Sequence, residues 1–306
     1  MRRETRIVAL LAALLAVLCL ILSLNYLKSS GGETPEPSAS AQQSTGDASG
    51  SAQQTGAEEG AFTLYCPDVG KADAFLLQSA AGSLLIDTGE DPADVLALLR
   101  SHQVSKLDAV VLSHLDKDHI GGAAAVLEQV EVQTLYRTDR EEDSAAYAAL
   151  VHALSLSDAQ SVTVTETLTV SAAGAELTLY PPLSPDYGKD EDNNASLIAA
   201  VEAGGVRMLF TGDALKSRVQ EFLAEQHDGS DYQLLKVPHH GRETKPTALL
   251  LENFSPRYAL ISSSEEEPEN EKLLKRLEKA GVEPLLLREG AVQLRCQDAA
   301  IERVSE

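Results

Sequence analysis

Cysteine, histidine and tryptophan are scarce in this 306-residue chain. There are three cysteines, seven histidines and no tryptophan. No Cys-x-x-Cys pair occurs, so redox chemistry of paired thiols has no support. A Gly-x-Ser-x-Gly elbow and a phosphate-binding glycine loop are also missing from the sequence. Their absence removes the support for a serine hydrolase or a nucleoside triphosphatase.

Basic side chains are few as well. The chain has 25 Lys and Arg against 47 Asp and Glu, a formal net charge of −22. Such a charge favours solubility and argues against tight, non-specific binding to nucleic acid. It does not exclude an anionic substrate, because bound metal ions would dominate the local field of a site.

The N-terminal segment differs from the rest in composition. Residues 2–6 are basic, and residues 7–24 form an apolar run whose helix would be about 27 Å long, close to a bilayer core of about 30 Å. We predict a single-pass cell-membrane anchor at residues 1–27, with the basic end in the cytoplasm and the rest of the chain extracellular. The alternative is a cleaved signal peptide, whose apolar region is usually about 7–15 residues, and which would leave a secreted protein.

Residues 28–60 are rich in Ser, Gly, Gln, Thr and Glu. They lack the apolar side chains needed to offset ordering entropy, so we predict a disordered linker. Residues 61–306 remain, within the size range of a single α/β domain. This domain contains Cys66 and Cys296. An extracellular location permits a disulfide between them, and two buried free thiols are the alternative.

Short apolar runs alternate with helical patterns through this domain. Strands are predicted at residues 61–66, 74–79, 83–89, 107–114, 132–137, 161–170, 175–182, 206–213, 232–241, 258–264 and 282–296. Helices are predicted at residues 91–102, 121–130, 143–154, 215–226 and 269–281, the first with Asp91 as N-cap. This alternation predicts an α/β fold of layered sheets covered by helices.

The stretch "SHLDKDHIGG" at residues 113–122 concentrates potential metal ligands. It holds His114, Asp116, Asp118 and His119. Residues 114 and 116 would face one side, while residues 118 and 119 diverge toward a second position roughly 3.5 Å away, the separation of two-metal hydrolytic sites. The glycines that follow would let the backbone approach closely and begin a helix.

Other strand-like runs also end in polar residues able to bind metal: Asp87, Asp213, His239 and His240. Sites in α/β proteins form where the carboxyl ends of strands converge. Imidazole and carboxylate together suit Zn²⁺, Mn²⁺ or Fe²⁺, and a larger share of oxygen ligands favours Mn²⁺. The sequence therefore predicts a metal centre at this edge.

"SHLDKDHIGG" resembles the His-x-His-x-Asp-His signature of the metallo-β-lactamase-fold hydrolases. It is closest to the subgroup with Asp at the second position, as in the extracellular C-terminal domain of ComEC-type DNA-uptake (competence) proteins. The resemblance covers nearly all of residues 61–304, through "DVGKADAFLLQ", "LLIDTG", "EDNNASL", "LFTGD", "LKVPHHG" and "LLLREGAVQLRC". It implies a four-layer αββα sandwich, here preceded by a transmembrane helix and a disordered linker.

The resemblance also implies two divalent ions, Zn²⁺ or Mn²⁺, and a metal-bound hydroxide as nucleophile. His114 and Asp116 would bind one ion and Asp118, His119 and His240 the other, with Asp213 bridging both. Asp118 and Asp116 would be the catalytic carboxylates, Asp118 orienting the hydroxide. Residues that would orient the ligands or line the substrate side are Asp73, Asp87, Asn194, Ser196 and His239.

Four positions on the substrate side depart from the subgroup's pattern: Lys71, Ala72, Arg242 and Glu267. The predicted ligands are intact, which favours a metal-dependent hydrolase with altered substrate preference. We predict hydrolysis of phosphodiesters such as DNA or nucleotides. Hydrolysis of another ester, a lactone or an amide, and a non-catalytic metal-binding ectodomain, are the alternatives. The sequence predicts no oligomeric state.

Overall fold

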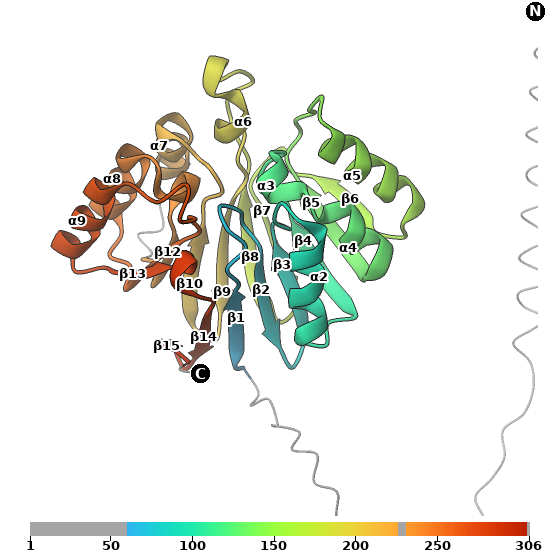
Figure 1. Ribbon diagram of the computed structural model, residues 1–306, viewed down its shortest axis with the longest axis horizontal. Helices are drawn as coiled ribbons and strands as arrows, with labels where there is room; N and C mark the ends of the chain where they lie inside the picture. The colour runs from blue at the N-terminus through green and yellow to red at the C-terminus, as the bar shows by residue number, and fades with distance from the viewer. Residues whose placement is uncertain (1–59, 226–230, 305–306) are drawn as a thin grey trace, which may run out of the picture. The chain divides into compact units, whose positions relative to one another are not determined.

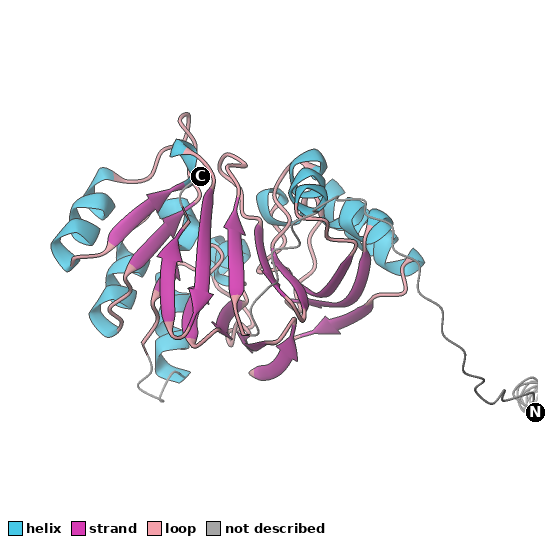
Figure 2. Ribbon diagram, turned by 90° about the horizontal axis from the view of Figure 1, so that it is seen from below, coloured by secondary structure: helices cyan, strands magenta, loops and turns pink. Residues whose placement is uncertain are grey.

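Two mixed β-sheets lie face to face in the computed structural model, which describes residues 60–225 and 231–304 (Figure 1, Figure 2). The predicted membrane anchor and all of the predicted linker except Gly60 lie outside these described residues. Within the two described ranges, no helix has both the length and the apolar character needed to span a bilayer.

The first sheet has the strand order β15-β14-β1-β2-β3-β4-β5-β6. Strands β3 to β6 run parallel to one another, and β15, β14, β1, β2 and β3 pair antiparallel. The strands are β1 (Phe62–Cys66), β2 (Phe75–Ser79), β3 (Gly82–Ile86), β4 (Lys106–Val111), β5 (Glu131–Arg137), β6 (Gln160–Thr163), β14 (Val292–Gln297) and β15 (Ala300–Arg303).

The second sheet has the order β13-β12-β11-β10-β9-β8-β7. Here β10 to β13 are parallel, and β7 to β10 pair antiparallel. The strands are β7 (Leu168–Ala172), β8 (Ala175–Tyr180), β9 (Ile198–Ala203), β10 (Val206–Phe210), β11 (Leu234–Lys236), β12 (Tyr258–Ile261) and β13 (Glu283–Leu286). Each sheet therefore has a parallel part whose carboxyl ends share one edge.

The main core lies between the sheets. Strand β1 shows why: Phe62, Leu64 and Cys66 alternate with less buried residues and join a core cluster that both sheets supply. The outer face of the first sheet packs on α2 (Pro92–Ser101), α4 (Ala123–Gln129) and α5 (Ala145–Leu156) (Figure 1). The outer face of the second packs on α7 (Lys216–Glu225), α8 (Thr244–Asn253) and α9 (Glu271–Ala280). The layers are helix, sheet, sheet, helix, as the sequence predicted.

Shorter elements connect these layers at the edge where strands end. They are α3 (Lys117–Ile120), η1 (Gly188–Asp190), α6 (Glu191–Asn194), η2 (Pro238–Gly241) and η3 (Leu287–Glu289). The prediction of one helix over residues 121–130 was incomplete, because α3 precedes α4 and carries part of the predicted metal-binding stretch.

Two predicted strands each divide into a pair of strands in opposite sheets. The run at residues 161–170 becomes β6 and β7, and the run at residues 282–296 becomes β13 and β14. In both cases a short non-strand segment lets the chain cross the sandwich. Elements absent from the prediction are β9, β15, α8 and the short η1 and α6.

Cys66 and Cys296 are both free and buried. In the β1–β14 ladder Cys66 pairs with Val292, while Cys296 pairs with Phe62. Four residues of strand, about 13 Å, therefore separate the two thiols, whereas a disulfide needs Cα atoms within about 7 Å. The free-thiol alternative is the one found.

Candidate metal centre

The polar residues predicted at strand ends converge on one edge of the sandwich. Asp87 follows β3 and His114 follows β4 in the first sheet. Asp213 follows β10, and His240 lies in η2 after β11, in the second sheet. The site therefore forms where the carboxyl ends of parallel strands from both sheets meet.

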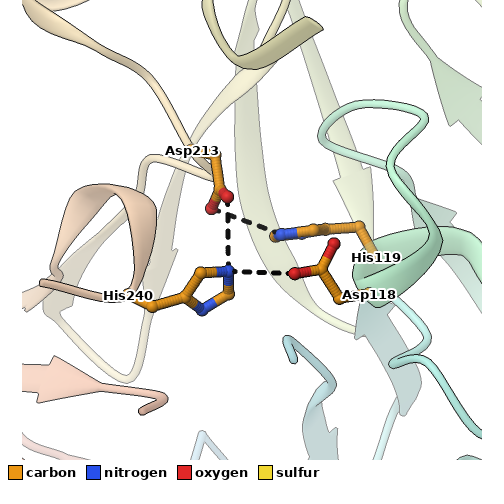
Figure 3. A group of neighbouring side chains, drawn as sticks. All are labelled: Asp118, His119, Asp213 and His240. Atoms are coloured by element: carbon orange, nitrogen blue, oxygen red, sulfur yellow. Dashed lines mark ion pairs between the residues drawn. The ribbon is translucent and has the colours of Figure 1, made fainter. Parts of the chain in front are cut away.

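Four side chains form one compact group (Figure 3). The ligand atoms of Asp118, His119, Asp213 and His240 all lie within 4.8 Å of one another. Asp213 lies between the two imidazoles: its Oδ1 is 3.3 Å from His119 Nε2, and its Oδ2 is 3.2 Å from His240 Nε2. Asp118 Oδ2 is 3.5 Å from His240 Nε2.

His114 and Asp116 extend this group to one side. His114 Nε2 is 3.5 Å from Asp116 Oδ2 and 4.0 Å from Asp213 Oδ2. Asp213 Oδ2 thus faces both His114 and His240, while Oδ1 faces His119. His114, His119, Asp213 and His240 are all buried, and we call these four residues the floor of the centre.

The backbone around Asp118 and His119 is held by two loops of the first sheet. The peptide N–H of Asp73 donates to the Asp118 carbonyl (3.1 Å), and that of Thr88 donates to the His119 carbonyl (2.7 Å). A Cβ added at Gly121 would overlap the carbonyl oxygen of Glu90, so the close approach predicted for the double glycine is present. One difference is that Asp118 and His119 lie in the one-turn helix α3 rather than in an extended turn.

His240 reaches Asp213 from a turn with strained backbone angles. His239 and His240 have φ values of 49° and 52°, in the left-handed region that non-glycine residues rarely adopt. Such a conformation costs on the order of 1–3 kcal/mol and tends to persist where function requires it. His239 is partly exposed, and its Nε2 lies 4.0 Å from Asp213 Oδ2, at the margin of the floor.

The other ring nitrogen of each floor histidine is already engaged. His119 Nδ1 lies 2.9 Å from Asp87 Oδ2, and His240 Nδ1 lies 2.9 Å from the Ser262 carbonyl. A carbonyl or carboxylate oxygen only accepts, so Nδ1 carries a proton and Nε2 is the nitrogen left to face a metal. His114 Nδ1 similarly faces the hydroxyl of Ser113 at 3.1 Å.

The remaining nitrogens provide the test of whether metal ions fit. His114, His119 and His240 each bury Nε2 with no hydrogen-bond partner, and Asp213 likewise buries Oδ1. Buried polar atoms left unpaired are costly, and here they converge on one small volume. Imidazole nitrogens and carboxylate oxygens are the donors that Zn²⁺ and Mn²⁺ take. The described residues therefore fit divalent ions at this position.

The charges of these side chains also indicate a site for divalent ions. Burial alone would raise the pKa of Asp213, but His240 and His119 outweigh it and hold the pKa well below its usual range. Burial would lower the pKa of His119, but Asp213 and Asp87 outweigh it and raise that pKa. The centre thus attracts protons in place of cations, and divalent ions would displace those protons.

A second group lies behind the first. The ligand atoms of Asp73, Asp87 and His119 also lie within 4.8 Å of one another, and the two groups are consistent with a binuclear metal centre. Lys236 Nζ is 2.6 Å from Asp73 Oδ2, and both side chains are buried. Ser262 donates its hydroxyl to Asp73 Oδ1 and also faces His240. Asp73 and Asp87 therefore reach the floor through the histidines and Ser262.

Two further predicted residues support the turn after β10. Ser196 Oγ accepts from the peptide N–H of Asp213 (3.1 Å), and so holds the backbone of the floor. Asn194 Oδ1 accepts from the peptide N–H groups of Leu215 and Arg218, at the beginning of α7. Asn194 thus acts on α7, while Ser196 acts on the floor directly.

The prediction missed three residues that position the floor. Ser113 donates its backbone N–H and its hydroxyl to Asp87, each at 2.7 Å, and lies within the quoted metal-binding stretch. Lys236 and Ser262 hold Asp73. A signal was present for Lys236, because a charged residue in the apolar run "LLKV" needs a buried partner.

With this geometry established, sequence comparison identifies the family. Residues 67–264 match the model of the metallo-beta-lactamase superfamily. The chain belongs to this superfamily, and the sandwich and the His/Asp centre are its fold and its site. The two mixed sheets described above are thus the α/β metallo-β-lactamase fold.

Within that superfamily the chain is related to competence proteins. It is 30% identical over 210 residues to the competence protein ComA of Neisseria gonorrhoeae, covering 67% of this chain and 27% of that protein. It is 24% identical over 221 residues to the ComE operon protein 3 of Bacillus subtilis (strain 168), covering 64% of this chain and 27% of that protein. The chain thus spans about a quarter of the length of these relatives.

Among solved structures, a mutant of the β-hydroxylase CmlA matches with a TM-score of 0.54 and 12% identity, over 76% of this chain and 54% of that one. This likeness concerns the fold alone. The reaction must therefore be argued from the site.

Proposed function

We propose that this domain is a metal-dependent hydrolase of phosphodiesters, acting on DNA or nucleotides. The observation that carries the proposal is that three buried imidazole nitrogens make no hydrogen bond and lie 3.2 to 4.0 Å from the carboxylate oxygens of Asp213. The relation to competence proteins supports the choice of a phosphodiester among hydrolysable bonds. The net charge of −22 leads us to expect no tight, non-specific binding to nucleic acid.

The floor and its neighbours offer places for two ions, Zn²⁺ or Mn²⁺. His114 and Asp116 would hold the first, Asp118, His119 and His240 the second, and Asp213 would bridge them, by the distances above. When bound, such ions would lower the pKa of water to about 7 and polarise a phosphoryl oxygen.

Asp118 and Asp116 are proposed as the catalytic carboxylates. Both are less buried than the floor, so they can meet substrate and water as well as hold an ion. Charges from His240, His119 and Lys71 outweigh burial and hold the pKa of Asp118 far below its usual range, so it stays an acceptor that can orient an attacking water. Burial lowers the pKa of His239, so this ring is neutral at pH 7 and available to a substrate oxygen.

The test is an assay of the full-length protein after loading with Mn²⁺ or Zn²⁺. We expect cleavage of bis-p-nitrophenyl phosphate and of DNA or nucleotide esters, with no turnover of lactones. Elemental analysis should give about two ions per chain, as a two-metal site requires. Turnover of lactones alone would overturn the choice of phosphodiesters. A protein that holds ions but cleaves none of these substrates would leave the non-catalytic metal-binding ectodomain, and a protein that retains no ion would reject the metal centre.

We also propose that the domain lies outside the cell on a single-pass anchor. The basic residues 2–6 followed by the apolar residues 7–24 support this placement. Mass spectrometry of the cell-derived protein tests it. A full-length mass in the membrane fraction is expected, whereas a shortened chain in the medium would indicate a cleaved, secreted protein.

A further inference from the structure

Three charged side chains form a row that begins at the metal centre. Lys71 Nζ lies 2.8 Å from Asp118 Oδ2 and 3.9 Å from Glu267 Oε2. The other oxygen of Glu267, Oε1, lies 3.2 Å from an Arg242 guanidinium nitrogen. We call Lys71, Glu267 and Arg242 the charged row. They are three of the four positions that depart from the subgroup's pattern, and they come from three separate loops.

The row leads from the centre toward solvent. The side chain of Lys71 is 22% exposed, while those of Arg242 and Glu267 are 44% and 47% exposed. A molecule whose scissile bond reaches Asp118 would therefore meet Lys71 next, and Arg242 beyond it. The fourth departing residue, Ala72, is buried and does not belong to the row.

Glu267 occupies the position that a ligand anion would take. Its two oxygens face two cations, which is how a phosphate or carboxylate group binds between Arg and Lys. The contact with Lys71 is long and the contact with Arg242 is exposed, so both are weak and easily exchanged. The peptide N–H of Glu267 is held by Ser264 Oγ at 3.0 Å, so the side chain can turn away while its backbone stays.

The lining on the other side of the centre is mainly acidic. A small hollow beside Asp116 is lined by the acidic residues Asp116, Glu141, Glu142, Glu191 and Asp192. The cation in that lining, Arg140, is already paired with Asp139 and Glu191 at 3.0 and 2.9 Å. An anionic group is therefore opposed on the Asp116 side. On the other side it would meet Lys71 and Arg242, although the exposed Glu265 and Glu266 directly precede Glu267 in sequence.

We propose that the charged row is a subsite for a second anionic group of the substrate, a terminal phosphate, which displaces Glu267 from between Lys71 and Arg242. This rests on the hydrolase function proposed above and narrows its substrate. The favoured substrate is a short phosphodiester with a phosphate on one side of the scissile bond. A long polyanion, which would extend past Asp116 as well, is disfavoured.

The test compares two esters that differ only in the second anion. The full-length, Mn²⁺-loaded protein is assayed with the 5′-p-nitrophenyl phosphate ester of thymidine, with and without a 3′-phosphate. We expect a KM about tenfold lower for the ester with the 3′-phosphate, as one extra charge-assisted contact would give. The Arg242→Gln variant should reduce this preference about fivefold, and Glu267→Gln should increase it. Lys245→Gln, an exposed cation three residues from Arg242, is the matched control and should keep the wild-type preference.

Equal KM values for the two esters in the wild-type protein would overturn the subsite. So would a preference that neither Arg242→Gln nor Glu267→Gln alters. Calorimetric binding of thymidine 3′,5′-bisphosphate separates this failure from a failure of the hydrolase function. Binding that Arg242→Gln weakens, without cleavage of either ester, would retain the subsite and reject the hydrolase.

Discussion

The floor of the centre and the charged row are held by different kinds of contact. Each floor histidine is buried and has one ring nitrogen fixed by a buried group. The charged row depends on ion pairs between side chains that are 22–47% exposed. Replacing one residue of a buried network is costly, because its partner is left buried without a hydrogen bond. Exposed ion pairs contribute only about 0–1 kcal/mol to stability.

This difference agrees with the expectation from the sequence that the ligands keep the subgroup's pattern while the charged row departs from it. Every predicted ligand is present in the floor and beside it, and the residues behind it are hydrogen-bonded to one another. The charged row can vary without disturbing those bonds. We infer that a change of substrate in this fold is most accessible at the row, where a new side chain displaces water rather than a buried partner.

The largest effect in this comparison is expected at Asp213. Asn in place of Asp213 removes the charge that lies between His119 and His240. We expect metal affinity to fall by more than the roughly 10–100-fold typical of losing an outer partner of a ligand. Elemental analysis after dialysis measures this, with phosphodiester turnover lost in parallel. Asp158→Asn is the matched control, an exposed Asp on the connection after α5. Normal metal content in Asp213→Asn would remove Asp213 from the centre.

The next largest effect is on folding. Lys236→Met should lower the free energy of unfolding by about 3–5 kcal/mol, because it removes the cation nearest to the buried Asp73. Urea denaturation of the metal-free protein measures this without any contribution from bound ions. The control is Lys106→Met, which breaks an exposed pair with Glu131 at 3.1 Å and should cost less than about 1 kcal/mol. Equal losses in the two variants would contradict the contrast between buried and exposed contacts.

A smaller effect is expected at Asp87, one step behind the ligands. Asp87→Asn weakens the hold on His119 Nδ1 and on Ser113 but leaves every proposed ligand in place. Metal affinity should fall about 10–100-fold, as for other outer partners of ligands. A competition titration with a chromogenic chelator measures this, and Asp158→Asn again serves as the control. An unchanged affinity would mean that Asp87 supports the fold and not the ions.

The sequence predicted the floor better than it predicted the elements around it. His114, Asp116, Asp118 and His119 are close in the chain, so their proximity follows from local geometry. Asp213 and His240 could be joined to them because parallel strands end at a shared edge. The family pattern then supplied the order of the segments.

What escaped prediction depends on long-range partners. Lys236 meets Asp73 across 163 positions of sequence, and no local pattern pairs them. Strand β9, with the sequence IAAVEA, is apolar on nearly every residue because it is buried on both faces. It therefore lacks the alternation that marks a half-buried strand. The charged row was visible only as separate departures, because Lys71, Arg242 and Glu267 meet only after the loops converge.

The smallest predicted effect is a gain in metal affinity rather than a loss. It distinguishes the charged row from the floor. Lys71 places a positive charge 2.8 Å from Asp118 Oδ2, a proposed ligand of the second ion. That ammonium opposes a divalent cation at the same carboxylate, so Lys71→Met should raise affinity for the second ion about fivefold. A metal titration followed by calorimetry would show this as a tighter second step.

The control for this prediction is Lys117, which lies in α3 together with Asp118. Lys117 is next to Asp118 in sequence, but its ammonium pairs with Glu90 at 2.7 Å and is largely exposed. Lys117→Met removes the same charge and should leave the second step unchanged, because solvent screens it from the ion. If Lys71→Met instead weakens the second ion, Lys71 positions Asp118 as a ligand and belongs with the floor. The charged row would then consist of Glu267 and Arg242 alone.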